Sequence, residues 1–402
     1  MVLPDDFYCR DEAERRWLSV CGELASRFAG RAEAHDREGS FPFENFEELR
    51  RAGYLALTVP RELGGSGAGV FLMVLCQEAL ARGDGSTALG AGWHQMTLGR
   101  LAARPTWPAA ALQRVFRDAV ERGALINGAV SEPATGSPSR GGRPTTAARR
   151  TGDGWVLAGR KVFTTMAPGM ATFVVSASAE GIEPTASFLV PREAPGVSIV
   201  ETWDALGMRA SGSHDLVLTD VSLPAEALVE PAPRPDDAAD AGAEVRGGST
   251  AGWGLHIPAT YLGVARAAAD YATRFAVRRR PNSLQGSIAD VPHIQEKIGE
   301  MERQLLAAYT PLFTLARRWD DDPAAREVMG GAVAACKTLV MDAVLRVVDL
   351  AGRVVGAAGL ARGVPIERYY RDARPGLHNP PMEDAVLASL ARQAIRQAEA
   401  AP

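Results

Sequence analysis

The chain has 402 residues, more than one compact core usually organises, so two or three domains are expected. Its 46% hydrophobic and 23% charged residues are typical of a soluble globular protein. The formal net charge of −4 provides no general attraction to nucleic acid or to an anionic membrane, so neither is expected as a partner.

The four cysteines are far apart in the sequence and form no CxxC pair: Cys9, Cys21, Cys76 and Cys336. This spacing predicts buried thiols, with no metal site and no disulfide framework. The acidic N-terminal stretch lacks the apolar segment of a signal peptide, and no apolar run reaches the roughly 18 residues of a membrane span. We therefore expect a cytoplasmic protein.

From about Asp11 to Arg122 the apolar residues repeat at helical spacing. Leu18, Cys21 and Leu24 lie three residues apart, which places them on one helix face. Residues 70–82 and 86–104 are apolar on most sides, which predicts two central helices. Residues 1–123 are therefore interpreted as an all-α domain.

Between about residues 125 and 228 the hydrophobic period changes to two. The expected strands are rich in Val, Phe and Thr and are separated by Gly, Pro or Asp: residues 155–165, 172–178, 186–192, 197–202 and 214–223. Because no helices lie between these strands, residues 124–230 are predicted to form an antiparallel β-barrel or sandwich.

Residues 231–249 are rich in Pro, Ala, Asp and Gly, which is typical of a solvated linker. Helical periodicity then returns in four segments: His256–Arg279, Val291–Trp319, Pro323–Gly352 and Glu383–Ala398. Antiparallel helices of this length predict a four-helix bundle in residues 250–402. The expected fold is thus α+β and multidomain.

Three stretches of the β zone resemble acyl-CoA dehydrogenases. Residues 130–137, VSEPATGS, are similar to TEPxxGSD, and residues 154–165 are similar to the GxxLxGxKxxIT strand pair. Residues 203–214, followed by VSLP, are similar to WxxxGMRxTxS…VxVP. Residues 60–65 and 365–374 extend the resemblance to almost the whole chain. It implies an oxidoreductase of this family, with the three-domain fold already expected.

The resemblance implies an FAD cofactor, or FMN if the enzyme is a monooxygenase. Phe163 would pack against the flavin ring, and the Thr165 hydroxyl would bond near its N5 atom. A flavin must also be held along its pyrimidine side and its phosphates. Those contacts are expected from Val130, Ser131, Gly136 and Ser137.

Other cofactor contacts are expected from the helical C-terminal zone. In the family, an arginine near Arg279 and Arg280 reaches the FAD pyrophosphate of a neighbouring subunit, and the guanidinium fork suits phosphate. The alternative is a pair of cations complementing a helix C-terminus. Arg353, Gly356 and Asp384 would meet the ADP half. This arrangement implies a homodimer or homotetramer.

The family's catalytic glutamate is missing from both of its usual places. Counted from the shared RDAR segment, one position falls on Pro380, and the other falls near Trp253 and Gly254. Proline and glycine cannot accept a proton. Glu383 is a candidate displaced base, although the first turn of a helix also favours acidic residues.

Histidines offer a second interpretation. Residues 371–380 resemble the RxxRxxxLHDP segment of flavin-dependent monooxygenases on the same fold. By that resemblance His94, Ser131 and His378 would surround the reactive edge of the flavin and transfer protons. His94 could instead be a hydrogen-bonded core residue, and His256 could also face the pocket.

Three functions follow. The first is the α,β-dehydrogenation of an acyl thioester, on CoA or a carrier protein, with a separate electron acceptor. The second is a monooxygenase that oxidises a small molecule and needs a flavin reductase. The third is a non-catalytic flavin-binding relic.

Overall fold

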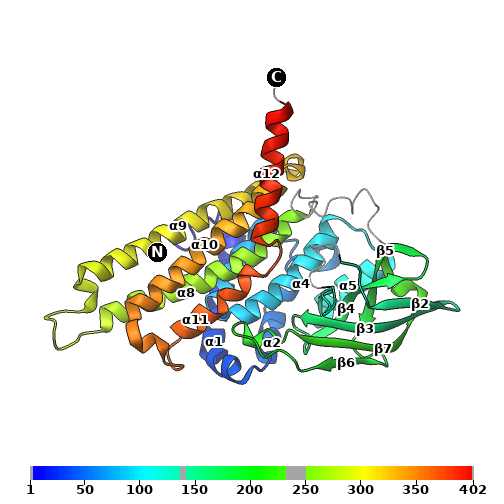
Figure 1. Ribbon diagram of the computed structural model, residues 1–402, viewed down its shortest axis with the longest axis horizontal. Coiled ribbons are helices and arrows are strands. Elements are labelled where there is room, and N and C mark those ends of the chain that lie inside the picture. Colours follow the sequence, from blue (N-terminus) through cyan, green and yellow to red (C-terminus); the bar gives the residue numbers. More distant parts are fainter. Residues whose placement is uncertain (1–2, 136–141, 232–249, 401–402) are drawn as a thin grey trace.

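The computed structural model describes residues 3–135, 142–231 and 250–400. The N-terminal helices lie between a β-sheet on one side and the long C-terminal helices on the other (Figure 1). The predicted Gly136 and Ser137 contacts fall outside the described residues.

The N-terminal helices are α1 (Glu12–Glu38), α2 (Phe43–Arg51), α3 (Val70–Ala81), α4 (Gly85–Ala103) and α5 (Ala109–Arg122). The Asp11 side chain caps α1 by accepting a hydrogen bond from the Glu14 amide, and Gly39 ends it at φ +69°. Almost every residue of α3 is buried, which agrees with its uninterrupted apolar sequence. The helix is therefore a central element.

The sheet contains β1 (Leu125–Ala129), β2 (Ala147–Thr151), β3 (Gly154–Thr164), β4 (Met170–Ala179), β5 (Ile182–Pro191), β6 (Val197–Val200), β7 (His214–Pro224) and β8 (Leu228–Pro231). The strand order is β6-β7-β3-β2-β4-β5-β8, and β1 pairs with β4. The sheet departs from the expected antiparallel pairing in one respect, because β4 pairs in parallel with both β1 and β2. The remaining pairs are antiparallel.

The C-terminal zone contains α8 (His256–Arg278), α9 (Pro292–Asp321), α10 (Gly330–Val355), the short α11 (Ile366–Asp372) and α12 (Glu383–Ala400). The predicted α+β multidomain fold is confirmed. Helices α8, α9 and α10 share one hydrophobic core with α3. The fourth helix packed in this core is therefore α3, where the sequence had suggested the last helix of the chain.

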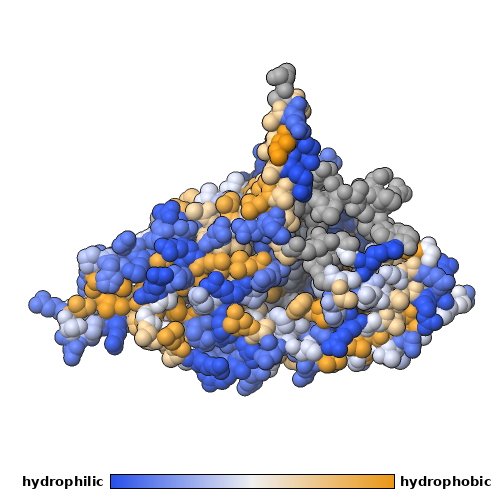
Figure 2. Space-filling view, viewed as in Figure 1, coloured by the Kyte–Doolittle hydropathy of each residue, from blue (hydrophilic) through white to orange (hydrophobic). Residues whose placement is uncertain are grey.

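Helix α12 extends away from the body of the protein (Figure 1). Its Val386 is buried, whereas Leu387 and Ile395 are more than half exposed. Apolar residues are visible along this helix (Figure 2). No helix in the described ranges is long and apolar enough to cross a membrane.

Candidate functional site

An exposed aromatic ring marks the end of β3. The Phe163 side chain is 64% exposed, and its backbone is in the left-handed region at φ +55°. Such a conformation is costly for a non-glycine residue and is often retained at functional sites. The Trp203 ring meets Phe163 edge-on, with 6.1 Å between ring centroids. We call Phe163, Thr165, Val130 and Ser131 the platform.

The Thr165 hydroxyl begins a chain of side-chain oxygens. Its Oγ1 lies 3.0 Å from Ser213 Oγ, which lies 2.7 Å from Ser211 Oγ. Backbone bonds hold the same turn, because the Met166 amide donates to the Ser211 carbonyl at 2.9 Å. The Thr165 hydroxyl is therefore held in place two residues after the exposed ring in the sequence.

The segment after β1 lies against the same strand. The Val162 amide donates to the Ser131 carbonyl at 2.9 Å, so the structure brings Val130 and Ser131 beside Phe163. The Val130 side chain is 41% exposed. The segments that contain Ser131 and Val162, 31 positions apart in the sequence, are thus neighbours in the structure.

A buried ion pair holds this segment in place. Lys161 Nζ lies 2.6 Å from Glu132 Oε1, and both side chains are inaccessible to solvent. The Thr145 and Thr146 amides also donate to this carboxylate. Burial opposes ionisation of Glu132, but the hydrogen bonds from Lys161 and the threonines outweigh it and lower the pKa to about 2. The carboxylate therefore stays charged and fully bonded.

These features fit a planar ring cofactor. A flavin needs a flat apolar contact and hydrogen-bonding groups at its edge. Phe163 offers the former in an exposed position, and the Thr165 hydroxyl offers the latter.

His94 does not fit the catalytic role expected for it. The ring is completely buried, its Nε2 bonds to the Leu55 carbonyl at 2.8 Å, and its Nδ1 accepts from the Ile126 amide at 3.2 Å. Burial lowers its pKa to about 4, so the ring is neutral. With both nitrogens engaged, His94 joins α4 to β1 as a core residue.

His378 has a different environment. It follows the short helix formed by Arg374–Leu377, and its side chain is exposed. The next residue, Asn379, is fixed by the Tyr261 hydroxyl of α8, which donates to its Oδ1 at 2.5 Å. His378 is thus an accessible imidazole on a segment anchored to the bundle.

His256 is a further candidate at the start of α8. Its Nδ1 lies 2.9 Å from the Trp253 carbonyl, an acceptor only, so Nδ1 carries the proton and donates. The buried Nε2 is then an acceptor that has no partner among the described residues. Burial lowers the pKa of this imidazole to about 4. A buried, unpaired acceptor of this kind is rare and is often functional.

Glu383 and Asp384 lie in the first turn of α12 and are exposed. This agrees with the alternative explanation that acidic residues are favoured in the first turn of a helix. Asp384 has an interaction within the protein.

The expected phosphate-binding residues lie elsewhere. Arg279 and Arg280 follow α8 and are exposed, and Gly356 ends α10 at φ +69°. Arg353 Nε donates to Asp349 at 2.8 Å. These residues are at the C-terminal ends of α8 and α10, and these two helix ends are remote from the sheet (Figure 1).

Some relevant residues carried no signal of their own in the sequence. Trp203 and Ser213 are part of a recognised motif, but only the structure shows that they support Phe163 and Thr165. Asp372 contacts the Met208 amide across 164 positions of sequence. No local pattern predicts a contact of that range.

Three family models match in order: the acyl-CoA dehydrogenase N-terminal domain at residues 11–104, the middle domain at 127–221 and the C-terminal domain at 254–376. The chain is 46% identical to the putative acyl-CoA dehydrogenase YdbM of Bacillus subtilis over 96% of this chain and 99% of that protein.

Another relative is named for a different reaction. The amino sugar nitrososynthase RubN8 of Streptomyces rubradiris is 34% identical over 89% of this chain and 84% of that protein. The structure of KijD3 in complex with FMN and dTDP-3-amino-2,3,6-trideoxy-4-keto-3-methyl-D-glucose is 28% identical, with a TM-score of 0.82, covering 96% of this chain and 94% of that one.

The matched domains, their order and the near-complete overlap with YdbM agree with the motifs and the three-part fold. The exposed Phe163 ring and the Thr165 hydroxyl fit the flavin cofactor of this family. The chain belongs to the acyl-CoA dehydrogenase family and is a flavin-dependent oxidoreductase.

Proposed function

We propose that this enzyme is a monooxygenase that uses reduced flavin and O₂ to oxidise a nitrogen or sulfur centre of a small molecule. The observation that carries this proposal is the accessible imidazole of His378 in place of a carboxylate base. Four carboxylates on the elements near the platform are all engaged: Glu132 by Lys161, Asp204 by Arg209, Asp215 by Arg160 and Asp372 by the Met208 amide.

Each part of the site has a separate task. A bound reduced flavin supplies two electrons, so that one oxygen atom of O₂ enters the substrate and the other leaves as water. Phe163 would pack against the ring, Thr165 would bond at its edge, and Ser131 would fix its orientation. The exposed His378 imidazole, which can carry and release a proton, would donate the proton needed by the departing oxygen.

The relatives support nitrogen as the atom that is oxidised. RubN8 is an amino sugar nitrososynthase, and KijD3 was solved with FMN and an amino sugar nucleotide. FMN has no ADP half, so the platform of one chain would hold it without the remote arginines. We propose FMN or FAD as the flavin, and a separate flavin reductase as the source of electrons.

Acyl thioester dehydrogenation is the second candidate, and His256 is the observation that favours it. Removing a proton beside a thioester carbonyl requires a base, and His256 Nε2 is an unprotonated, unpaired nitrogen. Its pKa of about 4 is close to that of an ordinary glutamate, roughly 4.3. YdbM, named as a putative acyl-CoA dehydrogenase, also favours this reaction.

One experiment separates the two reactions. In the first assay, the flavin-loaded protein is mixed anaerobically with a panel of acyl-CoA thioesters. In the second assay, which is aerobic, it is mixed with a flavin reductase, NADH, O₂ and a panel of amines and thioethers. The monooxygenase proposal expects products that carry one added oxygen atom and no bleaching by thioesters. Bleaching of the flavin by any acyl-CoA would overturn it in favour of dehydrogenation.

His378→Ala tests the imidazole directly. We expect it to lower oxygenated product by about a hundredfold, the usual contribution of a general acid, while flavin binding is retained. His35→Ala is the matched control, because His35 bonds Ser40 and Glu44 on the surface between α1 and α2. Equal product from the His378 variant and the control would remove the catalytic role.

A further inference from the structure

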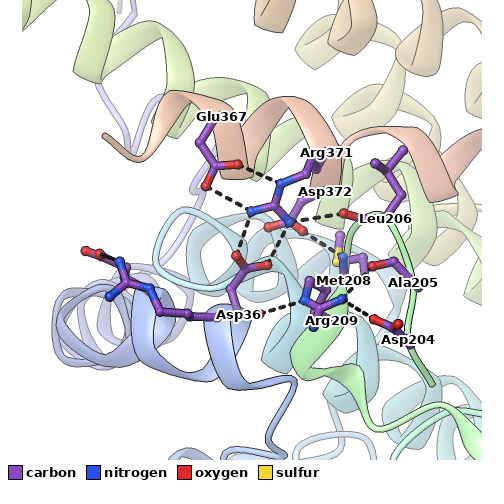
Figure 3. Close-up of polar contacts among 11 residues, drawn as sticks. Asp36, Asp204, Ala205, Leu206, Met208, Arg209, Glu367, Arg371 and Asp372 are labelled. Atoms are coloured by element: carbon purple, nitrogen blue, oxygen red, sulfur yellow. Dashed lines mark hydrogen bonds and ion pairs between the residues drawn. The ribbon is translucent and has the colours of Figure 1, made fainter. Parts of the chain in front are cut away.

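A buried carboxylate of α11 holds the loop between β6 and β7. Asp372 Oδ1 accepts a hydrogen bond from the Met208 amide at 2.7 Å, and both residues are almost inaccessible to solvent (Figure 3). Met208 has a left-handed backbone, at φ +52° and ψ +35°. That conformation is unfavourable for methionine and must be maintained by its surroundings.

The same loop residue supports the platform. The Met208 carbonyl accepts a hydrogen bond from Trp203 Nε1 at 2.9 Å. The Trp203 ring in turn meets the Phe163 ring at 87°. The Asp372 carboxylate is therefore connected to Phe163 through two hydrogen bonds and one aromatic contact.

Ion pairs fix α11 relative to this loop. Arg371 bonds the Asp36 carboxylate of α1 at 2.6 and 3.0 Å, and it also donates to the Leu206 carbonyl at 3.0 Å (Figure 3). The loop approaches α11 so closely that a Cβ atom at Gly207 would lie 2.2 Å from the Arg371 carbonyl oxygen. Helix α11 thus acts as a rigid base for the loop.

We propose that Asp372 is a positioning residue for the flavin: by binding the Met208 amide it fixes Trp203, which holds the Phe163 ring in its exposed orientation. This inference rests on the proposed flavin site at the platform. It assigns the C-terminal domain a part in cofactor binding that is separate from any phosphate contact. The residue itself touches neither cofactor nor substrate.

The chemistry of the contact predicts which substitutions are tolerated. Asparagine keeps an oxygen at the position of Oδ1, so Asp372→Asn retains an acceptor for the Met208 amide. Leucine has a similar size but leaves that buried amide unpaired, which releases Met208 from its left-handed conformation. Trp203→Phe removes only the bond from Nε1 and keeps a ring next to Phe163.

The test is a titration of each folded variant with FMN and with FAD, in which binding is measured by quenching of flavin fluorescence. We expect about a tenfold loss of affinity for Asp372→Leu and about threefold for Trp203→Phe, and less than twofold for Asp372→Asn. Asp204→Leu is the control, because Asp204 lies on the same loop but is 92% exposed. Its affinity should remain unchanged.

Phe163→Ala separates failure of this inference from failure of the flavin site. If Phe163→Ala weakens flavin binding but Asp372→Leu and Trp203→Phe do not, the positioning role is wrong and the site stands. If Phe163→Ala also has no effect, the flavin binds elsewhere and both proposals fall. Should Asp372→Leu not fold, Trp203→Phe alone decides: unchanged affinity overturns the role.

Discussion

The platform and the remote end of the long helices were both expected to bind the flavin, yet they are built differently. At the platform, segments from β1, β3 and the loop before β7 are joined by hydrogen bonds and a buried ion pair. At the remote end, Arg279 and Arg280 are exposed, and Arg353 bonds to Asp349.

This difference indicates which contacts with the flavin a single chain can provide. The platform orders its side chains within one chain, so on the proposed assignment one chain is expected to hold the ring. The remote arginines are expected to reach a flavin only if a second chain brings its own platform to them. Ring binding and phosphate binding are therefore expected to respond differently to mutation.

The largest expected effect concerns the ion pair beneath the platform. Lys161→Met leaves the Glu132 carboxylate buried without its partner, which should lower the free energy of unfolding by about 3–5 kcal/mol. Urea unfolding at pH 7 measures this. The control is Arg149→Met, because Arg149 lies 3.6 Å from Asp220 in a largely exposed pair that contributes about 0–1 kcal/mol.

The same pair predicts a pH dependence. The pKa of Glu132 is lowered to about 2 in the folded protein, below its ordinary value of 4.5. Its contribution to stability is therefore complete above pH 4.5 and decreases as the pH falls toward 2. Urea unfolding from pH 6 to pH 3 should show this decrease in the native protein, and a smaller one in Lys161→Met. Parallel curves would contradict the assignment.

Phe163→Ala tests the platform itself. Loss of the aromatic surface should weaken flavin binding by about tenfold to a hundredfold, the range for stacking of a planar base on an aromatic side chain. Fluorescence titration with FMN provides the measurement. Phe7→Ala is the matched control, since Phe7 is 56% exposed near the N-terminus and its ring meets that of Tyr8 edge-on. A similar loss in both variants would mean that the effect is not specific.

The sequence predicted the elements better than the contacts between them. The helix predicted at His256–Arg279 is observed at His256–Arg278, and the strand at residues 155–165 is observed as Gly154–Thr164. The strands β1, β2 and β8 were missed because they are only four or five residues long and lack a clear alternation.

For the site residues too, the sequence predicted local position better than distant contacts. Phe163 and Thr165 belong to a local motif, so their neighbourhood could be predicted from the sequence. His94 was placed correctly on a helix, but the partners of its ring, Leu55 and Ile126, are 39 and 32 positions away. Whether a buried histidine is structural or reactive depends on such distant groups, which periodicity does not reveal.

His94 and His256 allow a further test, which compares the unfolding free energy lost when each buried histidine is replaced. His94→Phe leaves the Leu55 carbonyl and the Ile126 amide unpaired and should cost about 2–3 kcal/mol in unfolding free energy. His256→Phe removes only the bond to Trp253 and an acceptor that was already unpaired, so about 1 kcal/mol is expected. Urea denaturation compares them. A larger cost for His256 would show that its Nε2 is bonded within the protein.

The smallest effect is expected at the remote arginines, and it depends on the cofactor. Arg280→Ala should leave FMN affinity unchanged, because FMN has no pyrophosphate and its ring is expected to bind at the platform. If a second chain supplies Arg280 to the pyrophosphate, FAD affinity should fall by about threefold to tenfold, as expected for one lost charged hydrogen bond. Titrations with both flavins, combined with light scattering to determine the oligomeric state, measure this. Equal losses for FMN and FAD would place Arg280 near the platform and contradict the division between the two regions.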